Sequence, residues 1–151
     1  MLCFQIALMS RGAINYANTG YQVKDMLRTI MLHTKITDTI LLVANPLGQS
    51  DQALSTKIYL NSKIGGKRNS VFIEPLIDTT LHLSITHNSV IESFKHDTKG
   101  ITYNDIAEKK KISCITFFEN TIERFSSLYP EFDTTHYSKI NAGKFLILVR
   151  K

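Results

Sequence analysis

The ten residues from Thr80 to Ser89 constrain the fold of this chain most, because apolar and polar side chains alternate along them. Alternation with a period of two is the pattern of a strand with one buried and one exposed face. The apolar side chains are Leu81, Leu83 and Ile85, and the polar ones are His82, Ser84 and Thr86. The stretch ends in small polar residues around His87, where a strand would meet a loop. We therefore expect a half-buried strand whose end offers an imidazole and hydroxyl groups to an anionic ligand.

Length and composition favour one globular domain over residues 1–151. The chain is 43% hydrophobic and 21% charged, which is enough apolar surface for a single core. No apolar run approaches the roughly 18 residues of a membrane span, and residues 1–9 lack the charged leader of a signal peptide. We expect no membrane partner. The only two cysteines, Cys3 and Cys114, form neither a disulfide framework nor a zinc spacing, which is typical of a reducing, cytoplasmic compartment.

The net charge of +5 indicates an acidic partner or a phosphate-bearing ligand. It is also compatible with binding to nucleic acid. However, the chain has no nucleic-acid-binding motif, and its lysines lie in separate runs without interleaved aromatic residues. A nucleic-acid partner is therefore not favoured.

Two stretches have the period of an amphipathic helix. The first covers residues 20–33, and the second covers residues 114–129 and ends before Pro130. Their apolar faces consist of Val23, Leu27, Ile30 and Met31 in the first and of Phe118, Ile122 and Phe125 in the second. We expect both faces to pack against a sheet.

Short β-branched or alternating runs predict the strands of that sheet. In addition to residues 80–89, these runs are 39–44, 56–60, 71–74, 90–94 and 145–149. A turn is expected at residues 45–48, and residues 134–144 are expected to be irregular. The fold class that follows is α+β, an antiparallel sheet packed by two main helices.

A basic turn is expected after residues 56–60, between two of these strands. It contains Gly65 and Gly66, followed directly by Lys67 and Arg68. Glycines let backbone N–H groups approach an anion closely, and the two cations would flank it. The turn is thus either a phosphate site or a solvated hairpin turn.

Three features follow one another in a definite order: the turn at residues 65–67, the strand that ends at residues 85–87, and the run from Asp105 to Ser113 before a Phe-rich segment. This order resembles the 4′-phosphopantetheinyl transferase superfamily. Those enzymes carry a Gly-Lys-Pro turn, a strand ending in Ser-His-Ser or Thr-His, a Gly-Ile-Asp-Ile-Glu run and a helix with Arg-Phe-Phe. The resemblance covers residues 11–125 and implies a transferase-like fold.

The resemblance implies a reaction in which the phosphopantetheine arm of coenzyme A moves to a serine of an acyl or peptidyl carrier protein, with Mg²⁺ as cofactor. The residues that would hold coenzyme A are Arg28, Gly66, Lys67, Arg68, Thr86 and His87. The residues that would serve catalysis are Asp105, Glu108 and Lys139, with the two carboxylates as the metal ligands. Carrier proteins are acidic, so the positive surface would attract them. The family builds its site from two half-domains or from several subunits, so a truncated copy and a homo-oligomer both stay open.

Two departures from the family pattern leave an alternative open. Glu108 lies one residue farther from Asp105 than the pattern requires, and Ile140 stands where the family has a glutamate. The alternative is a catalytically degenerate relative that retains coenzyme A or anion binding.

A further alternative is a two-histidine phosphoesterase. Residues 82–84 and 136–138 are both His-x-Ser elements. In such an enzyme each histidine would act as acid or base on a phosphodiester, and each serine would bind a phosphate oxygen.

Overall fold

The computed structural model describes residues 22–45, 50–76, 102–119 and 121–151. The five strands in these ranges form one sheet in the order β2-β1-β3-β5-β4. The strands are β1 (Thr39–Ala44), β2 (Val71–Pro75), β3 (Ile112–Phe118), β4 (Tyr137–Ala142) and β5 (Phe145–Arg150). β1 pairs in parallel with β2 and β3, whereas β5 pairs antiparallel with β3 and β4. The α+β class is confirmed, but the expectation of a purely antiparallel sheet is wrong.

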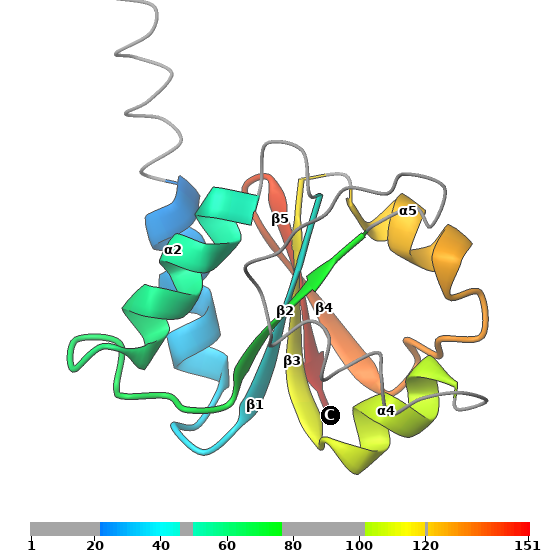
Figure 1. Ribbon diagram of the computed structural model, residues 1–151, viewed down its shortest axis with the longest axis horizontal. Helices are drawn as coiled ribbons and strands as arrows, with labels where there is room; N and C mark the ends of the chain where they lie inside the picture. The colour runs from blue at the N-terminus through cyan, green and yellow to red at the C-terminus, as the bar shows by residue number, and fades with distance from the viewer. Residues whose placement is uncertain (1–21, 46–49, 77–101, 120) are drawn as a thin grey trace, which may run out of the picture.

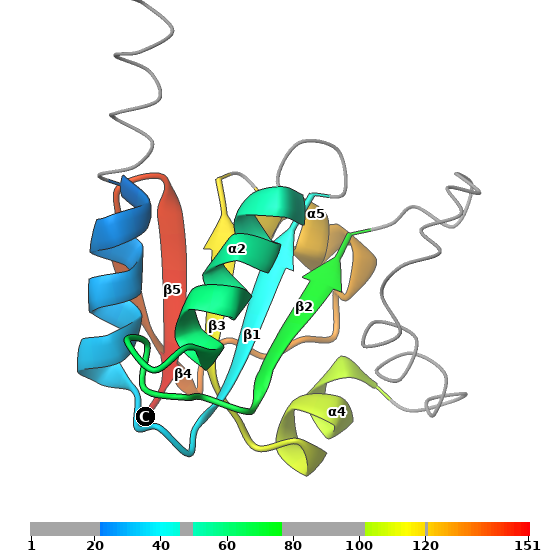
Figure 2. The ribbon, with the colours of Figure 1, turned by 60° about the vertical axis from the view of Figure 1, so that its left-hand side comes forward.

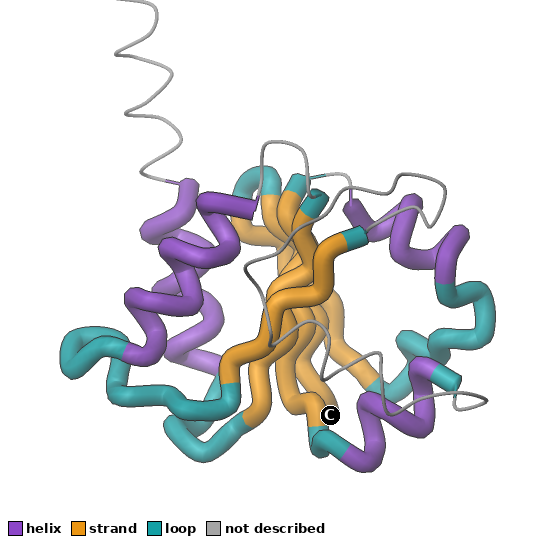
Figure 3. Tube along the Cα trace, viewed as in Figure 1, coloured by secondary structure: helices purple, strands orange, loops and turns teal. Residues whose placement is uncertain are grey.

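Helices cover both faces of the sheet. They are a helix over residues 22–33, α2 (Ser50–Asn61), α4 (Tyr103–Lys109) and α5 (Thr121–Leu128). Figures 1 and 3 show the helix over residues 22–33 and α2 on one face, and α4 and α5 on the other. The described part of the chain thus has four helices where two main ones were expected. Within these ranges, every helix is too short or too polar to cross a membrane.

β1 is a strand because its residues are apolar on both faces of the pleat. Its sequence, TILLVA, is buried from its second residue onwards. A continuous apolar run suits a central strand with a helical layer on each side, as in parallel sheets. The strand predicted at residues 39–44 is confirmed, as are those at 71–74 and 145–149.

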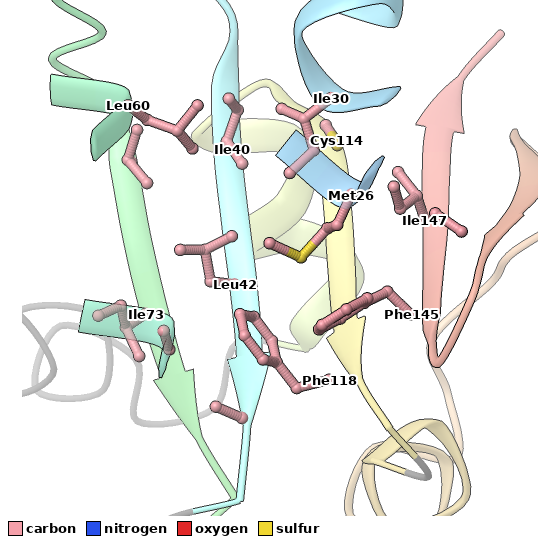
Figure 4. Close-up of a cluster of buried hydrophobic side chains, with 14 residues drawn as sticks. Met26, Ile30, Ile40, Leu42, Leu60, Ile73, Cys114, Phe118, Phe145 and Ile147 are labelled. Atoms are coloured by element: carbon pink, nitrogen blue, oxygen red, sulfur yellow. The ribbon is translucent and has the colours of Figure 1, made fainter. Parts of the chain in front are cut away.

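The sheet separates two apolar clusters. The cluster under the helix over residues 22–33 and α2 includes Met26, Ile30 and Leu42, all fully buried, and Figure 4 shows how these side chains meet above the strands. The cluster under α4 and α5 is rich in aromatic rings, with Phe125 in edge-to-face contact with Phe117 at 5.2 Å between ring centroids. Both clusters bury large side chains, so both helical layers are held to the sheet mainly by the hydrophobic effect.

The helix predicted over residues 114–129 is wrong in its first half. Residues up to Phe118 belong to β3, and the helix α5 begins only at Thr121. Phe118 and Phe125 were placed on one helical stripe, but they lie in different clusters on opposite faces of the sheet. A short apolar run has no period that separates a buried strand from a helix, and here the pairing of β3 between β1 and β5 decides.

Two other elements also differ from expectation. The strand predicted at residues 56–60 belongs to α2, whose buried residues Ala53, Thr56 and Leu60 follow a helical spacing of three and four. The segment expected to be irregular, residues 134–144, contains the strand β4 and the turn that joins it to β5. β4 is the edge strand of the sheet, with no neighbouring strand on one side among the described residues, and this explains its polar sequence.

The helix predicted over residues 20–33 is confirmed for residues 22–33. Ile30 is fully buried, as expected for its apolar face, but the buried methionine is Met26, whereas Met31 is 38% exposed. The strands predicted at residues 80–89 and 90–94 lie outside the described residues.

Candidate functional site

The direction in which strands are added to the sheet reverses between β1 and β3. From β1 the chain passes through α2 to β2 on one side, and β3 then lies on the other side of β1. In open sheets of parallel strands, ligands bind outside the carboxyl ends of the strands at such a reversal. The candidate site is therefore the edge of the sheet at Ala44 and Phe118, the last residues of β1 and β3. We call it the carboxyl edge.

Two helices begin at the carboxyl edge. α2 follows β1 and α5 follows β3, and Figures 1 and 2 show both helices starting beside the tips of these strands. The hydroxyl of Thr121, the first residue of α5, donates a hydrogen bond to the backbone O of Val43 at 3.3 Å. This bond ties the start of α5 to β1. The amino ends of helices carry partial positive charge and N–H groups without intrahelical partners, so this edge favours an anion.

A lysine and a glutamate flank the same edge. Glu119, directly after β3, has a φ of 47°, which turns the backbone sharply between strand and helix. Its Oε1 lies 3.8 Å from Nζ of Lys144, in the turn between β4 and β5. Both side chains are about half exposed, so this ion pair is weak. The amine of Lys144 is therefore available to a ligand phosphate.

The glycine-containing turn joins α2 to β2, not two strands, and it ends α2. Gly66 and Lys67 have φ values of 92° and 54°. The backbone N–H of Lys67 donates to the O of Ser62 at 2.8 Å, and that of Arg68 donates to the O of Leu60 at 3.0 Å. Left-handed residues whose N–H groups return to the last carbonyls of a helix are a common helix C-terminus. The turn therefore uses these N–H groups internally.

The side chain of Arg68 also belongs to the fold, because it is only 3% exposed. Its Nη2 donates to the backbone O of Thr34 at 3.1 Å, and its Nη1 donates to the backbone O of Lys35. These two carbonyls directly follow the helix over residues 22–33. A cation at this position satisfies the carbonyl of Thr34 and is a second donor to that of Lys35, which also accepts from the N–H of Asp38 at 3.1 Å; it also opposes the helix dipole. The structure thus uses Arg68 as a helix cap.

Asp105 caps the helix α4. Its Oδ2 accepts hydrogen bonds from the hydroxyl and the backbone N–H of Thr102, at 2.7 and 2.9 Å, and the Thr102 hydroxyl accepts one from the Asp105 N–H. This reciprocal pair is a capping box. The hydrogen bonds from Thr102, the side-chain one first, lower the pKa of Asp105. Glu108 is exposed on the same helix. Within the described residues, no three His, Cys, Asp or Glu side chains gather where they could hold a metal ion.

The described residues do not bring the expected phosphate and metal ligands together. Arg28 and residues 66–68 belong to the layer of the helix over residues 22–33 and α2, whereas Asp105 and Glu108 lie on α4, on the opposite face of the sheet (Figure 1). α4 precedes β3, so it lies at the amino end of that strand, roughly 20 Å from the carboxyl edge for seven residues. Lys139 is exposed on the edge strand β4. The remaining expected ligands, Thr86 and His87, lie outside the described residues.

A polar groove of about 570 Å³ lies between α4 and the ends of the β4–β5 hairpin. His136, from one of the two His-x-Ser elements, has its Nε2 3.5 Å from Oδ2 of Asp133. Asp133 in turn accepts hydrogen bonds from the N–H and the hydroxyl of Thr135, both at 2.8 Å, and these bonds lower its pKa. The second histidine of the expected pair, His82, lies outside the described residues. The groove lining includes Asn104, Glu108, His136, Tyr137, Arg150 and Lys151.

A buried polar cluster lies between α4, α5 and β2. Glu74 of β2 is 1% exposed and accepts a hydrogen bond from the hydroxyl of Tyr129 at 3.0 Å. The hydroxyl of Tyr103 is buried and has no hydrogen-bond partner among the residues that the structure describes. Burial and the nearby charge of Glu74 raise the pKa of Tyr103 well above its ordinary value, so this phenol stays protonated. The cluster links both helices to the sheet edge at β2.

Sequence reasoning did not find the residues of the carboxyl edge. Glu119 and Thr121 fell inside the wrongly predicted helix over residues 114–129, so the junction between strand and helix was missed. The polar pair after the aromatic run that ends at Phe118 could have indicated that junction. No protein-family model, curated protein or solved structure matches this chain.

Proposed function

We propose that this protein binds a phosphate-bearing, nucleotide-type ligand at the carboxyl edge. One observation carries the proposal: the strand order reverses between β1 and β3, and α2 and α5 both begin at that reversal. The two helix starts offer N–H groups and partial positive charge to a phosphate. Lys144 adds a full positive charge beside them, and the net charge of +5 favours the approach of an anion.

Coenzyme A is the first ligand to test, because it is an adenine nucleotide with three phosphate groups and the sequence resemblance also leads to it. The expected dissociation constant is in the micromolar range, which is about −8 kcal/mol. Adenosine without phosphate should bind far more weakly, since the proposal assigns the attraction to the phosphates.

The test is a titration of the ¹⁵N-labelled protein with coenzyme A, followed by amide chemical shifts. The largest shifts are expected at Asn45, Glu119 and Thr121, which border the carboxyl edge. Replacing Lys144 by alanine should weaken binding about fivefold to tenfold, as for the loss of one phosphate contact of about 1–1.4 kcal/mol. Lys109→Ala is the matched control, because Lys109 is an exposed cation at the end of α4, away from this edge.

A different pattern of chemical shifts and affinities would refute binding at the carboxyl edge. Shifts centred on residues 66–68 and a loss of affinity in Lys67→Ala but not in Lys144→Ala would refute the carboxyl edge. They would support the phosphate turn expected from the sequence.

The transferase step stays a separate proposal, supported by the sequence resemblance. It requires Mg²⁺ and an acceptor serine, and the described acids of α4 lie away from the carboxyl edge. The protein is incubated with coenzyme A, Mg²⁺ and an apo carrier protein, and the carrier is weighed. A mass gain equal to one phosphopantetheine arm that requires Mg²⁺ supports transfer. An unchanged carrier, together with bound coenzyme A, supports the degenerate alternative.

A further inference from the structure

The exposed apolar side chains of the described residues gather on one helical layer. Of the seven large apolar side chains that are exposed, six lie on the helix over residues 22–33, on α2 or in the turns that follow them. These six are Met31, Leu32, Ile36, Leu54, Ile58 and Ile64, and the seventh is Leu128 of α5. Scattered exposed apolar residues are ordinary, but a concentration on one surface indicates an interaction site.

The helix α2 is apolar on its outer side as well as on its inner side. Ala53 and Leu60 are buried against the sheet, while Leu54 and Ile58, four residues apart, form an outer stripe. Ile58 is 62% exposed. A helix with apolar residues on both sides normally has neighbours on both sides. The outer stripe of α2 therefore lacks a packing partner in the described part of the chain.

A groove runs along this layer. It has a volume of about 900 Å³ and is lined mostly by the helix over residues 22–33, together with Tyr59 of α2. Figures 1 and 2 show these two helices side by side. The apolar part of the lining consists of Val23, Leu27, Met31, Leu32 and Tyr59. Its apolar lining suits one amphipathic helix laid into a groove.

Positive charges outnumber negative ones around the groove. Lys24 and Arg28 line it, one helical turn apart, and Asp25 is the only acid in the lining. Over the two helices and the turns that follow them, residues 22–38 and 50–68, there are seven lysine and arginine residues and three acidic residues. Six of the cations are at least partly exposed, and Arg68 is buried; the six are Lys24, Arg28, Lys35, Lys57, Lys63 and Lys67. A partner that fills this groove must therefore carry acidic side chains beside its apolar stripe.

We propose that the groove of the helix over residues 22–33 and α2 binds an acidic amphipathic helix of a partner protein. Lys24 and Arg28 could each meet a phosphate, but the rest of the lining is mostly apolar, which favours a helix with apolar anchors over the phosphate backbone of a nucleic acid. The concavity also disfavours a flat lipid surface. A second copy of this face would bring together two surfaces that each carry an excess of cations, so like charges disfavour self-association through it. The inference is independent of ligand binding at the carboxyl edge.

The test uses a fluorescein-labelled 18-residue peptide helix with leucines at spacings of three and four and glutamates beside them. Fluorescence anisotropy with the full chain at low salt should give saturable binding that weakens in 0.5 M NaCl. The double variant Lys24→Glu/Arg28→Glu should weaken binding about tenfold, which is about 1.4 kcal/mol. Leu32→Ser should weaken it severalfold, and since Leu32 is 72% exposed, this change leaves the fold intact.

Two peptide controls and one protein control make the result specific. A peptide with lysine in place of every glutamate, and one with serine in place of every leucine, should both fail to bind. Lys109→Glu makes the same kind of charge change on α4, on the opposite face, and should bind the acidic peptide like the unchanged protein.

Three outcomes would overturn the proposal. The first is equal affinity for the acidic and the lysine peptide. The second is affinity that is unchanged in both the double variant and Leu32→Ser. The third is absence of peptide binding by a protein that sediments with anionic lipid vesicles or shifts a DNA duplex through the same residues.

Discussion

Replacing Arg68 by methionine separates a structural role of this residue from a ligand-binding role. The sequence places Arg68 beside a phosphate, whereas the structure buries it and directs its guanidinium at the carbonyls of Thr34 and Lys35. Methionine keeps most of the apolar length of the arginine but removes both hydrogen bonds and the charge. If the structural role is right, the variant loses stability, and under conditions in which it is still folded it binds ligand like the unchanged protein.

The size of the loss follows from the two hydrogen bonds. A hydrogen bond to a charged group contributes about 1.5–3 kcal/mol to stability, and a buried carbonyl left without a partner costs about 1–3 kcal/mol. The carbonyl of Lys35 keeps the hydrogen bond from the N–H of Asp38 at 3.1 Å, so the carbonyl that loses its donor is that of Thr34, which is buried. We therefore expect the free energy of unfolding to fall by about 3 kcal/mol, a large part of the roughly 5–15 kcal/mol typical of a domain.

Urea denaturation followed by circular dichroism measures this loss, with the slope of the transition checked for two-state unfolding. Lys67→Met is the matched control, because Lys67 precedes Arg68 and is exposed, and it should change stability by less than about 0.5 kcal/mol. A loss below about 1 kcal/mol in Arg68→Met, together with weakened coenzyme A binding, would refute the capping role and restore the phosphate role.

Three further predictions concern the two cores and one helix end. Phe125→Ala should lower the free energy of unfolding by about 3–5 kcal/mol, because the ring is buried among aromatic side chains; urea denaturation with the exposed Leu128→Ala as control checks this, and equal effects would contradict it. The lowered pKa of Asp105 means that its carboxylate stabilises the fold above about pH 4 and that this contribution is lost as the pH falls through the lowered pKa. The difference in stability between the unchanged protein and Asp105→Asn, measured from pH 7 to pH 2, should therefore vanish at the acid end. A difference that persists at pH 2 would argue against a role of the carboxylate. Burial raises the pKa of Cys114 to about 12, so in a Cys3→Ser variant the thiol should react with Ellman's reagent at pH 8 only when urea unfolds the protein, and rapid labelling of the folded protein would show that it is accessible.

The elements that the sequence predicted correctly are those with a clear local signal. The run of residues 39–44 is apolar from Ile40 onwards and bounded by polar residues, and the helix at residues 22–33 has its apolar residues at helical spacing. The errors are at residues 56–60 and 114–118, where an alternating or apolar run fits a helix and a strand equally well. In both cases the neighbours in the sheet decided the outcome, and those neighbours are far away in the sequence.

The candidate site was harder to predict than the fold. The glycines and cations at residues 65–68 have the composition of an anion site, but the chain uses their N–H groups and the Arg68 side chain to end two helices. Composition records which groups are present and not which partners they already have. The carboxyl edge joins residues that are about 75 positions apart, and only the parallel pairing of β1 and β3 brings them together.

By itself, the sequence of this protein determined the apolar core, the positive charge, the α+β class and several helices and strands. These features depend on composition and on the spacing of residues that are close together in the sequence. The tertiary structure alone decided that β1, β2 and β3 run parallel, which edge of the sheet receives two helix starts, and which charged side chains are consumed by capping. The physical reason is that strand order and burial result from contacts between residues that are far apart in the sequence. A short segment of sequence does not show which distant residues it will contact.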